Sequence, residues 1–76
     1  MEFQHITCNP KILGGKACIR GTRISVELIL EWIANGSTID EICTEFDQLS
    51  RESVREALLY AGQRSRNEFF YEVKVA

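Results

Sequence analysis

Apolar residues recur every three or four positions in three successive runs after residue 24, and this spacing predicts three helices. Ser25 and Ser50 precede the first and third runs as N-caps, and Thr38 with Glu41 marks the second as a capping box. Asn35-Gly36 supplies a stop for the first helix. The stripes expected to face the core are Val26, Ile29, Leu30 and Ile33; Ile39, Ile42, Cys43 and Phe46; and Val54, Ala57, Leu58 and Ala61.

The segments on either side of the helices have the character of strands. Residues 5–8 and 17–19 flank Gly14-Gly15, which predicts a small β-hairpin. Gly62 either ends the third helix or is tolerated inside it. Beyond it, residues 69–75 carry aromatic and β-branched side chains in partial alternation. This is the profile of a strand that needs the N-terminal strand or another chain as its neighbour.

These elements predict a mainly α fold, a three-helix helix-turn-helix-like domain with a small N-terminal β-hairpin and a possible C-terminal strand. Residues 1–24 form the hairpin and a basic, glycine-rich loop, 25–64 the three-helix core, and 65–76 an aromatic tail. The whole is one domain. A chain of 76 residues buries only ~60% of its unfolded surface, so we expect a partner subunit, and the family resemblance described below implies a homodimer.

The composition is that of a soluble globular domain, with 45% apolar residues. No apolar run approaches the ~18 residues of a membrane span and the N-terminus lacks a signal sequence, so we expect a cytoplasmic protein without membrane contact. The three cysteines are odd in number and include no C-x-x-C pair, which argues against disulfides and against a metal site. We expect no cofactor.

Charge is arranged in blocks along the chain. Residues 1–24 carry a net charge of +3, residues 25–50 a net charge of −6, and residues 51–76 a net charge of +1. A nucleic-acid contact would therefore come from the N-terminal loop or from the last helix, and not from the acidic middle of the chain. The candidate DNA-binding residues are Lys16, Arg20, Arg23, Arg51, Ser53 and Arg55.

Both basic segments have a second interpretation. Arg51 and Arg55 lie four apart in the first turns of the third helix, which enter the major groove in DNA-binding helix-turn-helix domains. Acidic residues at positions 52 and 56 lie beside them, so the same face can be a solvated set of ion pairs. In the loop, Arg23 is closest to the acidic first helix and is expected to pair with it, which leaves Lys16 and Arg20 to reach outward.

Large apolar side chains fall off the core stripes of the first and third helices. An exposed patch of this kind marks an interface, unless the hairpin or the C-terminal strand covers it. The aromatic tail can add a strand to the sheet of a partner protein. The residues expected at a partner interface are Leu28, Trp32, Leu59, Tyr60, Phe69, Phe70 and Tyr71.

No catalytic constellation is present in the sequence. His5 has no nucleophile near it in the pattern, and Cys18 lies beside Arg20, which can lower a thiol pKa, but no base accompanies it. The glycines do not match the phosphate-loop pattern G-x-x-x-x-G-K-[ST]. We therefore expect no enzyme and no small-molecule substrate, with a thiol-dependent enzyme built on Cys18 as a weaker alternative.

The run from Gly14-Gly15-Lys16 to Ile19-Arg20-Gly21-Thr22-Arg23-Ile24-Ser25-Val26, together with Leu49-Ser50 and Tyr60-Ala61, resembles the domain of unknown function 433 family over residues 5–62. This resemblance implies a helix-turn-helix-like domain with an N-terminal β-hairpin. It also implies the antitoxin half of a bacterial or archaeal type II toxin–antitoxin pair, which neutralises a PIN-domain-like ribonuclease toxin and binds operator DNA for autoregulation.

The sequence departs from this family in two places. Ala17 stands where the family often has proline, and the aromatic tail lies beyond the shared domain. The leading hypothesis is therefore a dimeric antitoxin that binds its own operator and a cognate ribonuclease. The alternative is a protein-interaction or dimerisation module of the same fold that does not bind DNA, which the mixed charge of the third helix favours.

Overall fold

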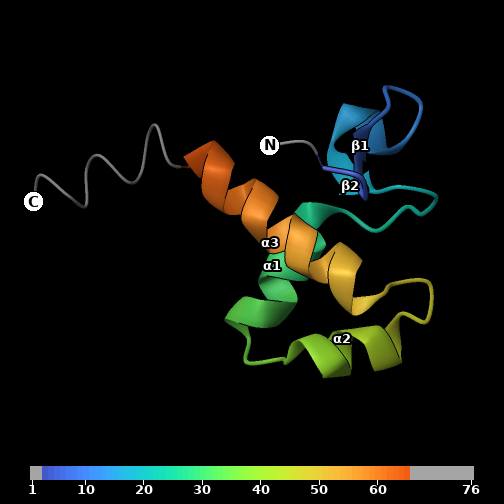
Figure 1. Ribbon diagram of the computed structural model, residues 1–76. Helices are drawn as coiled ribbons and strands as arrows, with labels where there is room; N and C mark the ends of the chain where they lie inside the picture. The colour runs from blue at the N-terminus through green and yellow to red at the C-terminus, as the bar shows by residue number, and fades with distance from the viewer. Residues whose placement is uncertain (1–2, 66–76) are drawn as a thin grey trace, which may run out of the picture.

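Three helices and one hairpin form the fold, as expected. The computed structural model describes residues 3–65. In Figure 1 the hairpin lies at one end and α2 at the other, with α1 and α3 crossing between them. The predicted tail strand lies outside the described residues. The elements are β1 (Ile6–Cys8), a short 3-10 turn (Leu13–Gly15), β2 (Ala17–Ile19), α1 (Val26–Ala34), α2 (Ile39–Glu45) and α3 (Arg51–Ser65).

The caps of α1 and α2 are those that the sequence predicts. The Ser25 hydroxyl accepts a hydrogen bond from the Leu28 amide at 3.0 Å. In α2, the Glu41 amide donates to the Thr38 hydroxyl at 3.1 Å and the Glu41 carboxylate accepts from the Thr38 amide at 2.8 Å. After α1 the chain turns at Gly36, whose φ of 97° is a conformation that glycine adopts without strain. Both helices are therefore positioned by local chemistry.

The start of α3 is held by two serines that exchange hydrogen bonds. The Ser53 amide donates to the Ser50 hydroxyl at 3.1 Å, and the Ser50 amide donates to the Ser53 hydroxyl at 3.0 Å. Two unpaired amides at the helix start are satisfied in this way. The helix then runs through Gly62 to Ser65, so Gly62 is an interior residue and does not end it.

The two strands are antiparallel and very short. Ile6 and Ile19 are buried against the helices. Cys18 is fully buried as well, and its thiol donates to the Thr22 carbonyl at 3.7 Å. A further bridge joins Cys18 to Ser25, just before α1. The register pairs Ile6 with Ile19, Thr7 with Cys18, and Cys8 with Ala17.

A tight turn with a buried threonine connects β2 to α1. Gly21 has a φ of 82°, which permits the reversal. The Thr22 hydroxyl donates to the Ile19 carbonyl at 2.8 Å and accepts from the Ile24 amide at 3.0 Å. The main chain closes the same turn, since the Ile19 amide donates to the Ile24 carbonyl at 2.9 Å. Every polar group at the centre of this buried turn thus has a partner.

The helical stripes are rotated slightly from the predicted ones in α1. Leu30, expected in the core, is 37% exposed, whereas Leu28 and Trp32 pack against the core as half-buried residues. Trp32 meets Phe46 of the α2–α3 connection edge to face, with ring centroids 5.2 Å apart. This aromatic contact turns the Trp32 side of α1 inward. The buried apolar residues are Ile6, Cys18, Ile19, Ile24, Val26, Ile29, Ile42, Leu49, Val54 and Ala57.

Replacement of Thr22 by valine tests the turn. Thr22→Val removes the acceptor of the Ile24 amide inside a buried turn, so we expect the free energy of unfolding to fall by about 1–3 kcal/mol. The matched control is Thr44→Val, because the hydroxyl of Thr44 is exposed and bonds only within α2. This control should change stability by less than about 0.5 kcal/mol. Equal effects of the two substitutions in urea denaturation would contradict the role assigned to Thr22.

Candidate functional site

The basic residues of the N-terminal loop have other partners than the sequence predicted. Lys16 Nζ lies 3.1 Å from Glu27 Oε1, so Lys16 makes the ion pair with α1 that was predicted for Arg23. Arg20 donates from Nε to the Gln4 carbonyl at 2.9 Å and from its guanidinium to the Ile6 carbonyl at 3.3 Å. Arg23 is exposed and has no acidic partner within ion-pair distance among residues 3–65. The prediction that Arg23 pairs with α1 is therefore wrong.

On α3, Arg51 and Arg55 are both exposed, but their surroundings differ. Arg51 forms an ion pair with Asp40 at the start of α2. Arg55 has no such partner in the described part of the chain, and the expected pairs with Glu52 and Glu56 are not formed. Within residues 3–65, Arg55 and Arg23 are therefore the candidate DNA-binding residues whose side chains make neither an ion pair nor a hydrogen bond.

Ser53 is removed from the candidate DNA-binding residues. Its side chain is 3% exposed and its hydroxyl donates to the Ser50 carbonyl at 2.8 Å. The polar character of Ser53 suggested a surface position in the first turn of α3. The structure shows instead a residue that faces the core and exchanges hydrogen bonds with Ser50 at the start of the helix.

A contact between the two ends of the domain was not foreseen from the sequence. Glu56 of α3 accepts from the His5 amide through Oε1 at 2.9 Å, and its Oε2 lies 2.6 Å from His5 Nδ1. The hydrogen bond from the His5 amide, followed by that from its ring, lowers the pKa of the Glu56 carboxyl below its usual value. The two residues are 51 positions apart, so no local pattern could have predicted their contact. The pair fastens the start of β1 to α3.

Three of the four predicted interface residues that lie within residues 3–65 pack within the domain. Leu28 and Trp32 are half-buried against the core. Tyr60 meets Phe3 edge to face, with ring centroids 5.4 Å apart, and the Arg64 guanidinium lies 5.7 Å from the Tyr60 ring centroid. Covering by the hairpin or the C-terminal strand, the alternative to an interface, does not describe Trp32, whose ring packs on Phe46 of the α2–α3 connection, whereas Tyr60 packs on Phe3 just ahead of β1.

Three exposed leucines remain on the surface of the described residues, Leu13, Leu30 and Leu59, at 38%, 37% and 41%. Of these, only Leu59 was expected at an interface. Leu30 was assigned to the core because its spacing fits the stripe of α1. Phe69, Phe70 and Tyr71, the remaining interface candidates, lie outside the described residues.

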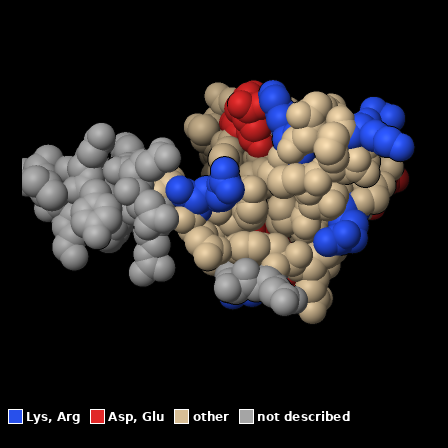
Figure 2. All heavy atoms as spheres, turned by 90° about the horizontal axis from the view of Figure 1, so that it is seen from above, with Lys and Arg blue, Asp and Glu red and all other residues tan. Residues whose placement is uncertain are grey.

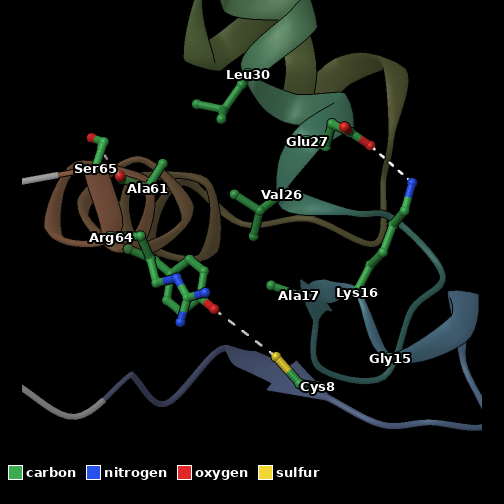
Figure 3. Close-up of a pocket in the computed structure, with 11 residues that line it drawn as sticks. Cys8, Gly15, Lys16, Ala17, Val26, Glu27, Leu30, Ala61, Arg64 and Ser65 are labelled. Carbon is green, nitrogen blue, oxygen red and sulfur yellow. Dashed lines mark hydrogen bonds and ion pairs between the residues drawn. The ribbon is translucent and has the colours of Figure 1, made fainter. Parts of the chain in front are cut away.

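An open groove of about 690 Å³ lies between the hairpin, the N-terminal half of α1 and the C-terminal half of α3. Its apolar walls come from Ala17, Val26, Leu30 and Ala61, as Figure 3 shows. The remaining lining residues are Cys8, Gly15, Lys16, Glu27, Tyr60, Arg64 and Ser65. The hydroxyl of Tyr60 lies 4.0 Å from the Cys8 thiol. The walls suit an apolar segment, and the rim is polar.

The surface carries no continuous basic patch on the face that Figure 2 presents. The Lys and Arg side chains of residues 3–65 appear there as separate groups between neutral residues, one of them beside acidic atoms. Cys18 is fully buried, which argues against this thiol as a nucleophile. Among the described residues, no cluster of His, Cys, Asp and Glu is able to hold a metal ion, and no helix has the length and apolar character to cross a membrane.

Comparison with known proteins identifies the family of this domain. The family model described as "Protein of unknown function (DUF433)" matches residues 6–61. The chain belongs to the DUF433 family. A crystal structure of a DUF433 member from Anabaena variabilis superposes with a TM-score of 0.74 at 26% identity, over 92% of this chain and 68% of that one.

A relative of this chain is larger. The uncharacterized protein y4eO of Sinorhizobium fredii is 34% identical over 56 residues, which make up 74% of this chain and 25% of y4eO. The chain thus spans about a quarter of the length of that relative. The family match over residues 6–61 begins at β1 and ends in α3, so in this chain it spans the hairpin, the turn at Thr22, α1, α2 and most of α3.

The Glu56–His5 contact makes the free energy of unfolding depend on pH. Because the pKa of Glu56 is lower in the folded chain than in the unfolded one, its charge stabilises the fold above about pH 4.5. That contribution is lost as the pH falls through the lower, folded pKa. Glu56→Gln should therefore unfold more readily at neutral pH and lose less stability on acidification, as measured by urea denaturation at several pH values.

The matched control is Glu52→Gln, an exposed position one turn earlier on α3. Its acid dependence should follow that of the native chain. If Glu56→Gln and the native chain lost stability in parallel between pH 6 and the acid range, the assigned role of Glu56 would be wrong.

Proposed function

We propose that this DUF433 protein is an antitoxin-like regulator that neutralises a PIN-domain-like ribonuclease and contacts operator DNA through its helix-turn-helix unit. The proposal is supported by the family resemblance and by one geometric observation. The first turns of α3 follow α2 in helix-turn-helix order and present Arg55 to solvent without an acidic partner among residues 3–65.

The proposed DNA contact uses few cations. Arg55 lies where a recognition helix reaches base edges or phosphates, and Arg23 adds a second exposed charge from the turn before α1. Arg51 reaches DNA only by exchanging its ion pair with Asp40 for a phosphate. An exposed pair of this kind contributes less than about 1 kcal/mol to stability, so breaking it to contact a phosphate costs little free energy. Affinity for DNA should consequently be modest and sensitive to salt.

The second candidate is an interaction module of the same fold that does not bind DNA. It is favoured by the charge of α2, where Asp40, Glu41 and Glu45 are all exposed, the helix carries no cation of its own, and only Asp40 is paired, with Arg51 of α3. Acidic residues next to the recognition helix repel the DNA backbone. In this function the same surfaces bind only proteins.

DNA binding separates the two candidates. The probe is a duplex of the DNA that precedes the chain's own coding sequence, titrated at two salt concentrations against a duplex of shuffled sequence. The regulator should prefer the native duplex, with affinity that falls steeply as salt rises. Arg55→Ala should weaken binding about tenfold and lower the salt slope by about one.

Arg64→Ala is the matched control, because it removes the same side chain from the far end of α3. It should leave DNA affinity unchanged. Equal weak binding of both duplexes, or no binding, would reject the regulator and favour the interaction module.

Partner binding has its own test, which uses the product of the adjacent reading frame. Co-expression with that product should yield a complex with the native chain and suppress the partner's ribonuclease activity. Leu59→Asp should weaken the complex at least about tenfold, because a charge would replace an exposed leucine at the interface. Leu13→Asp, at a similarly exposed leucine on the hairpin side, is the control. A neighbour that fails to bind the native chain would overturn the antitoxin proposal.

A further inference from the structure

The groove beside α3 has an apolar wall that the described residues leave uncovered. Leu30 lines it and is 37% exposed, whereas the apolar residues Val26, Ile29 and Ile33 of the same helix are packed inward. In Figure 3 the Leu30 side chain points into the space between α1 and the end of α3, with Val26 and Ala61 facing the same space. A long apolar side chain at the mouth of a groove of about 690 Å³ is suited to contact a further apolar segment.

The rim of the groove carries positive charge on the α3 side. Arg64 stacks beside Tyr60 and has no acidic partner within ion-pair distance among residues 3–65. On the opposite side, Lys16 is paired with Glu27 in an exposed and therefore weak ion pair. An occupant with apolar side chains and carboxylates would complement both the wall and the rim.

The chain itself supplies such a segment at the edge of the groove. Ser65, the last residue of α3, is one of the lining residues. The eleven residues 66–76 follow it and include two carboxylates, one arginine and one lysine. In an extended segment the apolar residues Phe69, Tyr71, Val73 and Val75 share one face, because side chains alternate along such a chain.

The segment is also long enough. Eleven extended residues reach about 36 Å. Two packed helices lie about 8–10 Å apart, so the chain can leave α3, cross the groove and pass Leu30 with residues to spare.

We propose that residues 66–76 dock in this groove of their own chain, with the face of Phe69 and Tyr71 on Leu30 and with Glu68 or Glu72 near Arg64. The docked segment covers Leu30 and the Cys8 thiol. This inference does not rest on the proposed function. Its consequence for any partner that binds the tail is that the partner must first displace it, so the groove and the partner compete for one segment.

Alkylation of Cys8 reports whether the groove is covered. Cys8 lines the groove and is exposed in the described residues, and Cys43 on α2 lies outside the groove. The purified full chain is treated with iodoacetamide, and peptide mass spectrometry gives the rate at Cys8 relative to that at Cys43. A segment docked about 90% of the time slows the reaction of Cys8 about tenfold.

Two full-length variants should abolish the protection of Cys8 from alkylation. Leu30→Glu places a charge on the groove wall, and the double substitution Phe69→Glu with Tyr71→Glu places charges on the docking face of the tail. Each should raise the relative rate at Cys8 about tenfold while circular dichroism shows an unchanged helix content. The fold is expected to tolerate both variants, because Leu30 is exposed and the tail variant leaves every residue of the described core unchanged.

Matched controls use the same substitutions elsewhere. Leu59→Glu changes a leucine of similar exposure that does not line the groove, and Phe70→Glu changes the opposite face of the tail. Both should leave the rate at Cys8 as in the native chain. An equal rate at Cys8 in the native chain and in the tail variant would overturn the proposal. Protection that increases with protein concentration would also overturn it, because the segment would then come from a second copy.

Discussion

The buried hydroxyl of Thr22 holds the turn between β2 and α1, and the position of the hairpin relative to the helices depends on that turn. Two three-residue strands have too few hydrogen bonds to be stable alone. They persist because the turn brings β2 directly against α1, where Cys18 bridges to Ser25 and Ile19 enters the core. Within residues 3–65, no buried side-chain nitrogen or oxygen lacks a hydrogen-bond partner.

Two further contacts fasten the hairpin from its other side. Arg20 holds the main chain of residues 4–6 through its guanidinium and through its own amide, which donates to the His5 carbonyl at 2.7 Å. Glu56 holds the same segment from α3. The glycine-rich, basic run that identifies the family therefore builds the domain, and Arg23 is its only arginine left without an intramolecular contact of this kind in the described part of the chain.

Local chemistry explains what the sequence could predict. The caps at Ser25, Thr38 and Ser50 act through residues three positions away, so their patterns are visible in the sequence and the helix starts are confirmed. Side-chain partners were harder to predict, because they depend on how elements pack. Glu56 was expected to pair along α3 but contacts His5, the residue before β1. Leu30 fits the core stripe of α1 by spacing, but the packing of Trp32 on Phe46 turns it outward.

Amide hydrogen exchange in the native state tests most directly whether the turn belongs to the core. The amide of Ile24, which donates to the Thr22 hydroxyl, should exchange only through global unfolding. Its opening free energy and its dependence on denaturant should then equal those of the Val54 amide in α3. Exchange of Ile24 through a local opening that is independent of denaturant, while Val54 remains protected, would contradict this account.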